Sequence, residues 1–247
     1  MTSDGPAQAR EEKLNSGSGW TMGLVAAASI GMMLGLVVLP AWAPNLASTL
    51  LGSSPKAYWY LSRGAAFVAL GLLWLSMMIG LLITDKIARS WPGAPAAFAS
   101  HEYVSLLGLA FAIFHALILL GDRYINYKLV QILLPFASVN YHPVWVGVGQ
   151  IGLYVWAIIN ASFYVRRSSG PGAWKLIHYA SFFVFAIALM HGLAAGTDSK
   201  TGSAQAAYWF FGGSVLFLTA YRVVSSLAAP ERRLPAAQPG TAPPTGD

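Results

Sequence analysis

The sequence predicts an all-α protein: an integral membrane bundle of six transmembrane helices with both termini in the cytoplasm. The first observation is composition, because 56% of the 247 residues are hydrophobic and only 10% are charged, against about 25% charged in soluble domains. The second is six apolar runs, each near the roughly 20 residues that a membrane helix needs. The runs cover 20–42, 57–84, 101–121, 143–165, 174–195 and 207–228.

The distribution of Lys and Arg predicts the orientation. With the six runs as spans, one side receives Arg10, Lys13, Lys86, Arg89, Arg166, Arg167, Lys175, Arg222, Arg232 and Arg233. The other side receives Lys56, Arg63, Arg123, Lys128 and Lys200. The richer side is cytoplasmic by the positive-inside rule. We therefore expect a multi-pass protein of the cell (inner) membrane. We expect the positive charges behind its net charge of +6 to interact with anionic lipid. Nucleic-acid binding is not expected, since no basic patch is interleaved with aromatic residues.

The chain divides into one membrane domain and two tails. Residues 1–19 are polar and mixed in charge, and 229–247 are rich in Pro, Ala and Gly; both are predicted to be disordered and cytoplasmic. The domain over 20–228 holds all six helices. Its first run is read as an uncleaved helix because it exceeds the roughly 7 to 15 apolar residues of a signal peptide. The apolar segment 124–138 contains Pro135 and is too short to span, so it is expected to be interfacial or re-entrant.

Four of the five histidines fall in two of the runs. His101 and His115 lie fourteen residues apart in the third run, and His178 and His191 lie thirteen apart in the fifth. An ionisable side chain in a membrane helix is costly and marks a candidate functional site. Neutral imidazole is a common axial ligand of haem iron, whereas the absence of cysteine excludes thiolate-ligated clusters. Two histidines on each of two helices can ligate two bis-histidine haems.

The expected topology supports this pairing in depth but not in angle. Both helices run outward, so His101 and His178 lie near the cytoplasmic face, with His115 and His191 about 20 Å further out. Fourteen residues return to within about 40° of the starting direction, whereas thirteen miss it by about 140°. The fifth helix is therefore expected to need a bulge, a bend or different side-chain rotamers, and one haem instead of two stays open. The alternative is a non-redox transporter that uses the histidines as a proton or metal relay. The lack of an internal sequence repeat argues against this alternative.

Three segments resemble the ferric reductase-like transmembrane family, which includes the membrane domains of NADPH oxidases and ferric-chelate reductases and the haem-binding subunit of periplasmic methionine sulfoxide reductase. They are Pro135-Phe136-Ala137-Ser138 with Tyr141-His142-Pro143 and Trp145-Val146-Gly147-Val148-Gly149, then Trp174-Lys175-Leu176-Ile177-His178-Tyr179, then His191-Gly192 with Gly196-Thr197-Asp198-Ser199. The resemblance spans about 57–228. It implies two b-type haems, held by His101 with His178 and by His115 with His191.

Two departures bear on what the resemblance implies. Many relatives carry Arg where this chain has His142. We predict that His142 lies near the outer haem, where three roles are open: it contacts a propionate, it tunes an acceptor site, or it has no special function. The oxidases continue into flavin- and nicotinamide-binding domains, and this sequence has no dinucleotide fingerprint in a strand–turn–helix context. We therefore expect an oxidoreductase component with a separate donor, which is a flavoprotein, a flavin or a quinol, and a periplasmic or extracellular acceptor. Arg63 either snorkels to the interface or pairs with a haem propionate.

Overall fold

The computed structural model describes residues 57–87, 93–139 and 141–228, together with 23, 26, 27 and 29–31. All regular secondary structure in these residues is helical. The predicted first transmembrane helix over 20–42 lies largely outside the described residues, and both predicted tails lie wholly outside them.

Five helices in the described part are long and apolar enough to cross a membrane. They are α3 (Ala57–Thr84), α4 (Ala94–Ile118), α6 (Pro143–Ser169), α7 (Pro171–Ala195) and α8 (Gly202–Ala228). Each has 25 to 28 residues, which at 1.5 Å per residue spans about 38 to 42 Å and exceeds the roughly 30 Å hydrocarbon core. The chain is thus an all-helical, multi-pass membrane protein, as the apolar runs predict.

Three of these helices begin earlier than the apolar runs predict. α8 begins at Gly202 and not at 207, and for α4 and α7 glycine–proline chemistry explains the difference. α4 begins at Ala94 and not at 101, and α7 begins at Pro171 and not at 174. Each follows a glycine with positive φ, Gly93 at 100° and Gly170 at 79°. Each also carries a proline in its first turn, where the missing N–H costs nothing and the fixed φ suits a helix. Both prolines therefore lie within the helices and help to start them.

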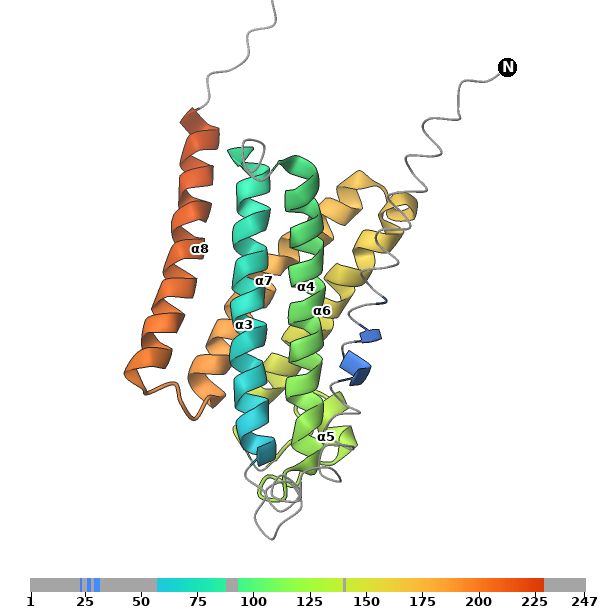
Figure 1. Cartoon of the computed structure of the whole chain (residues 1–247), viewed down its shortest axis with the longest axis vertical. Helices are drawn as coiled ribbons and strands as arrows, with labels where there is room; N and C mark the ends of the chain where they lie inside the picture. The colour runs from blue at the N-terminus through green and yellow to red at the C-terminus, as the bar shows by residue number, and fades with distance from the viewer. Residues whose placement is uncertain are drawn as a thin grey trace, which may run out of the picture.

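The segment between α4 and α6 does not span the bundle. It holds the short helix α5 (Leu129–Leu133) and lies at the end where α4 stops and α6 starts (Figure 1). Ile125, Tyr127 and Ile132 are buried there. The Gln150 amide of α6 donates to the carbonyls of Gln131 and Ile132, both at 2.7 Å, and so fastens this segment over the end of the bundle.

Two helical hairpins form the core of the protein. α3 and α4 stand upright side by side, and α6 and α7 run obliquely behind them (Figure 1). α4 and α7 run in the same direction, as the topology predicts. The hairpins pack through one buried apolar cluster, to which α8 adds a valine: Leu73, Met77, Trp156, Ile159, Val184, Phe185 and Val215.

α8 flanks the two hairpins and leaves most of its apolar surface uncovered by the described helices. Trp209 and Leu227 are each 81% exposed. Two polar contacts join α8 to α3 and the turn after it: the Trp74 indole donates to Ser214 Oγ at 2.8 Å, and Arg222 pairs with Asp85 at 2.6 Å. An apolar face of this extent suits lipid as its solvent.

Candidate functional site

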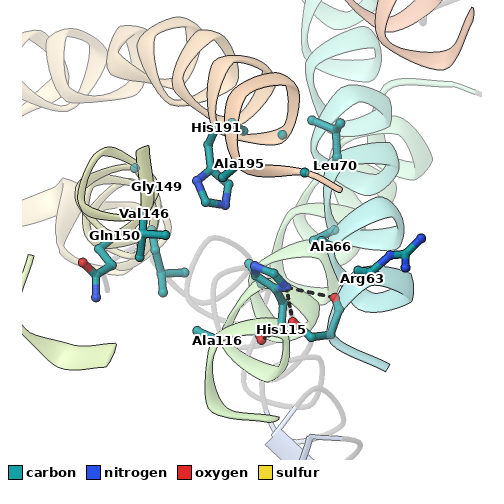
Figure 2. A pocket seen from close by; sticks show the side chains of 18 of the residues that line it. Arg63, Ala66, Leu70, His115, Ala116, Val146, Gly149, Gln150, His191 and Ala195 are labelled. Carbon is teal, nitrogen blue, oxygen red and sulfur yellow. Dashed lines mark hydrogen bonds between the residues drawn. The ribbon is translucent and has the colours of Figure 1, made fainter. Parts of the chain in front are cut away.

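The four membrane histidines meet as two facing pairs, one at each level of the bundle. His101 of α4 faces His178 of α7, with ring centroids 6.0 Å apart and planes at 75°. His115 of α4 faces His191 of α7, with centroids 6.3 Å apart and planes at 71°. Figure 2 shows the rings of His115 and His191 turned toward one another across a cavity. The pairing that the spacing predicts is therefore the pairing in the structure.

The spacing of thirteen residues on α7 requires no bulge. α7 is one uninterrupted α-helix from Pro171 to Ala195, yet both of its histidines reach α4. α7 runs obliquely behind α4 (Figure 1), so the side of α7 that faces α4 changes along the helix. Positions about 140° apart on a straight helix can then both face the same neighbour. Of the three adjustments expected for this helix, the bulge is absent from α7.

Backbone carbonyls hold three of the four imidazoles through Nδ1. His101 Nδ1 lies 3.0 Å from the Ser76 carbonyl, His115 Nδ1 2.9 Å from the Ser62 carbonyl, and His191 Nδ1 2.8 Å from the Trp145 carbonyl. A carbonyl oxygen only accepts, so each neutral ring carries its proton on Nδ1 and has a free lone pair on Nε2. This arrangement orients metal-binding histidines and raises their basicity.

Ser62 supports His115 with its hydroxyl as well as its carbonyl. Its Oγ donates to the His115 carbonyl at 3.0 Å and lies 2.9 Å from His115 Nδ1. The Ser62 side chain is almost fully buried, at 2% exposure. Ser76 repeats part of the arrangement one level away, with Oγ 3.2 Å from His101 Nδ1. α3 therefore orients both histidines of α4.

The separation of each pair matches two imidazoles on one metal ion. A metal–imidazole bond is about 2.0 Å long and a ring nitrogen lies about 1.1 Å from the ring centre, so two rings bound from opposite sides have centroids about 6 Å apart. Among the described residues, no group of three or more His, Cys, Asp or Glu side chains could hold a metal ion. Each pair therefore offers two imidazoles at the separation that one metal ion would need.

Two glycines leave room for the imidazoles. A Cβ at Gly149 would lie 2.6 Å from His191 Nδ1, and a Cβ at Gly80 would lie 3.2 Å from His101 Cε1. The first distance is too short for any side chain, so α6 can approach His191 this closely only through glycine. Gly152, one turn further along α6, would in the same way meet Ile187 at 2.7 Å.

The cavity at the outer pair has a volume of about 220 Å³ and mostly apolar walls. His115 and His191 lie across it, with Val146 and Gly149 of α6 on one side and Ala66 and Leu70 of α3 on the other (Figure 2). Small and aliphatic walls with two convergent nitrogens are the usual character of a cofactor site. Trp156 lines the cavity and is 6% exposed. Its ring lies 3.0 Å from where a Cβ of Gly108 would be, midway between His101 and His115.

Arg63 lies on the rim of this cavity. Its guanidinium points away from the two imidazoles (Figure 2), pairs with Asp198 from the turn after α7, and lies 5.6 Å from the centre of the Tyr60 ring. Its Nε is shielded from solvent and has no partner in the described part of the chain. An unpaired donor on a charged group at a cavity rim fits an anionic group.

His142 lies outside the cavity. It precedes α6 in the left-handed conformation, with φ 37°, and its side chain is exposed. Its ring meets the Tyr141 ring edge-on at 4.6 Å. Tyr141 itself lines the cavity, donating to the Ala195 carbonyl at 2.6 Å. His142 therefore approaches the site only through Tyr141.

Sequence reasoning found the histidines but missed their supports. Ser62, Ser76 and Trp145 act through carbonyl oxygens, which no side-chain motif marks. Gly149 belongs to a segment that resembles the ferric reductase-like family, Trp145 to Gly149, but its contact with His191 could not be read from the sequence. No protein-family model matches the chain, and no curated protein or solved structure is significantly similar to it.

Proposed function

We propose that this chain carries electrons across a membrane through two b-type haems, held by His101 with His178 and by His115 with His191. The observation that supports this most is the pair of facing imidazole couples, each at the separation that one bis-histidine iron requires. A haem iron bound there supplies reversible one-electron chemistry. The protein's part is to hold, orient and bury that group.

Each residue of the site has a definite task in this proposal. The carbonyls of Ser62, Ser76 and Trp145 keep three imidazoles in the tautomer that presents Nε2. Gly149 lets α6 close against His191. Arg63, with its unpaired Nε at the cavity rim, neutralises a propionate of the outer haem while its ion pair with Asp198 remains. The apolar walls exclude water and keep the site at low dielectric.

The proposal places the chain among ferric reductase-like membrane proteins, with six helices, both termini in the cytoplasm and the inner membrane as its location. The inner pair then faces the donor, which is a separate flavoprotein, a flavin or a quinol. The outer pair faces a periplasmic or extracellular acceptor. The sequence segments that resemble this family and the positive-inside charge pattern support this placement.

The test is a haem count on the detergent-purified protein, with a dithionite-reduced minus oxidised spectrum and a pyridine haemochrome assay. We expect a b-type spectrum with close to two haems per chain. One haem per chain would still support a haem-binding electron-transfer protein, but only one of the two histidine pairs would then be a haem site. No haem, from cells supplied with haem, would overturn the proposal and favour the histidine relay of a transporter, which proton flux in haem-free vesicles would then reveal.

A further inference from the structure

Of the four membrane histidines, His178 is the one whose ring no backbone carbonyl orients within the described part of the chain. It is held instead by Trp174, one helical turn earlier on α7. The indole and imidazole rings are stacked, with centroids 5.2 Å apart and planes at 21°. Positions four residues apart on a helix lie above one another, so this stack follows directly from the sequence spacing.

The Trp174 indole also has an unused donor. Its Nε1 is shielded from solvent and has no hydrogen-bond acceptor among the described residues. A shielded N–H without a partner is energetically unfavourable, and more so where lipid and not water is the solvent. Tryptophan at a membrane boundary usually turns this N–H toward water or headgroups. Here the ring lies inward against His178, so the missing acceptor belongs on the side of the site.

We propose that Trp174 Nε1 donates a hydrogen bond to a carboxylate of the cofactor held by His101 and His178, namely a propionate of the inner haem. This inference rests on the proposed function and assigns the inner site a binding residue beyond its histidines. A propionate is anionic and accepts, which suits an indole that only donates. The hydrogen bond to a charged acceptor is stronger than one to a neutral acceptor.

The two sites then hold their carboxylates by different means. At the outer site a guanidinium with an unpaired Nε, Arg63, lies on the cavity rim. At the inner site a cation, Lys175, directly follows Trp174 in the sequence. Its Nζ lies 5.8 Å from the centre of the Tyr179 ring. Trp174 is a neutral donor that also stacks on His178. A hydrogen bond from Trp174 to the carboxylate would therefore also help to fix the orientation of His178.

The experiment compares two cofactors in two proteins. Apoprotein of the full chain, wild type and Trp174→Phe, is reconstituted with haem or with haem dimethyl ester, which cannot accept as a carboxylate. The rate of haem loss to excess apomyoglobin is then measured. Phenylalanine keeps an aromatic ring for the stack and removes the N–H. Trp209→Phe on the exposed face of α8 is the matched control.

With natural haem we expect Trp174→Phe to speed the loss of one of the two haems by about 10- to 100-fold, the effect of removing a hydrogen bond to a charged group. With the ester, wild type and Trp174→Phe should lose that haem at equal rates. Equal rates with natural haem, or the same acceleration with both cofactors, would overturn the inference. Either result would leave the proposed function standing, whereas a wild-type protein that takes up no haem would remove both.

A second measurement does not depend on the variant folding. In the wild-type protein, ultraviolet resonance Raman reports the hydrogen bonding of indole N–H groups. Loading with haem should strengthen the N–H hydrogen bond of one tryptophan, and loading with the ester should not. An indole spectrum that is the same with both cofactors would contradict the assignment of Trp174.

Discussion

The Nδ1 atom of His191 lies 2.8 Å from the carbonyl oxygen of Trp145. This contact joins α7 to α6 and sets the ring so that Nε2 is directed toward His115, whose own Nδ1 is held by α3. Both imidazoles of the outer pair are therefore oriented before any metal binds. Preorganisation of this kind improves affinity because less conformational freedom is lost on binding.

Gly149→Ala tests whether the space beside His191 is required. The added Cβ would lie 2.6 Å from His191 Nδ1, so either the ring moves or the hydrogen bond to Trp145 breaks. We expect the haem count to fall from two to one per chain, with the inner haem retained. Pyridine haemochrome analysis of the purified variant measures this.

Gly64→Ala on α3 is the control for that variant, because its Cβ would meet nothing within 4 Å. In an exposed helix interior alanine is favoured over glycine by about 1 kcal/mol, so this control should keep both haems and be no less stable than wild type. A Gly149→Ala protein with two haems and an unchanged spectrum would show that the space beside His191 is not required for the outer haem.

Single alanine substitutions test the pairing itself. His101→Ala and His178→Ala should each remove the same haem, and His115→Ala and His191→Ala should each remove the other, because each iron needs both of its axial imidazoles. The midpoint potential that survives identifies which haem remains. His142→Ala, on an exposed side chain outside the cavity, should keep both haems. Four variants with four different surviving potentials would contradict the pairing.

The helices that carry the site follow from the sequence because their apolar runs exceed the length of a bilayer. The two histidine couples follow as well, since spacing along parallel helices sets their depths. Two features could not be predicted. The crossing of α7 behind α4 depends on how the two hairpins pack, and a helical-wheel argument treats neighbouring helices as parallel. The carbonyls of Ser62, Ser76 and Trp145 are backbone groups that every residue shares, so only the fold shows which ones meet an imidazole.

Arg63 and Asp198 give opposite predictions for the outer site. If Arg63 neutralises a propionate, Arg63→Gln should speed the loss of the outer haem by about tenfold or more, as expected for a charged hydrogen bond. Asp198→Asn frees the guanidinium from its present partner, so it should slow haem loss or leave it unchanged. Arg222→Gln is the control, because it removes a guanidinium of α8 that pairs with Asp85, just after α3. Faster loss in Asp198→Asn than in Arg63→Gln would assign the ion pair a purely structural role.

Tyr141 makes the stability of the outer end depend on pH. Burial, the largest cause, raises the pKa of Tyr141 above its ordinary value; nearby Tyr127 raises it further and Arg63 opposes the shift. The folded protein therefore favours the neutral phenol, which also donates to the Ala195 carbonyl. The stabilising effect is fully present below the unfolded pKa of about 10 and is lost as the pH rises through the higher folded value.

We therefore expect the melting temperature of the wild-type protein in detergent to fall more steeply than that of Tyr141→Phe as the pH rises above the unfolded pKa of about 10. Phenylalanine loses the hydrogen bond to Ala195 at every pH, so the variant should start from a lower melting temperature and then converge on the wild type. Tyr124→Phe, at a side chain that is 94% exposed, should follow the wild-type curve throughout. Parallel curves for wild type and Tyr141→Phe would show that the phenol is equally acidic in the folded and unfolded chains.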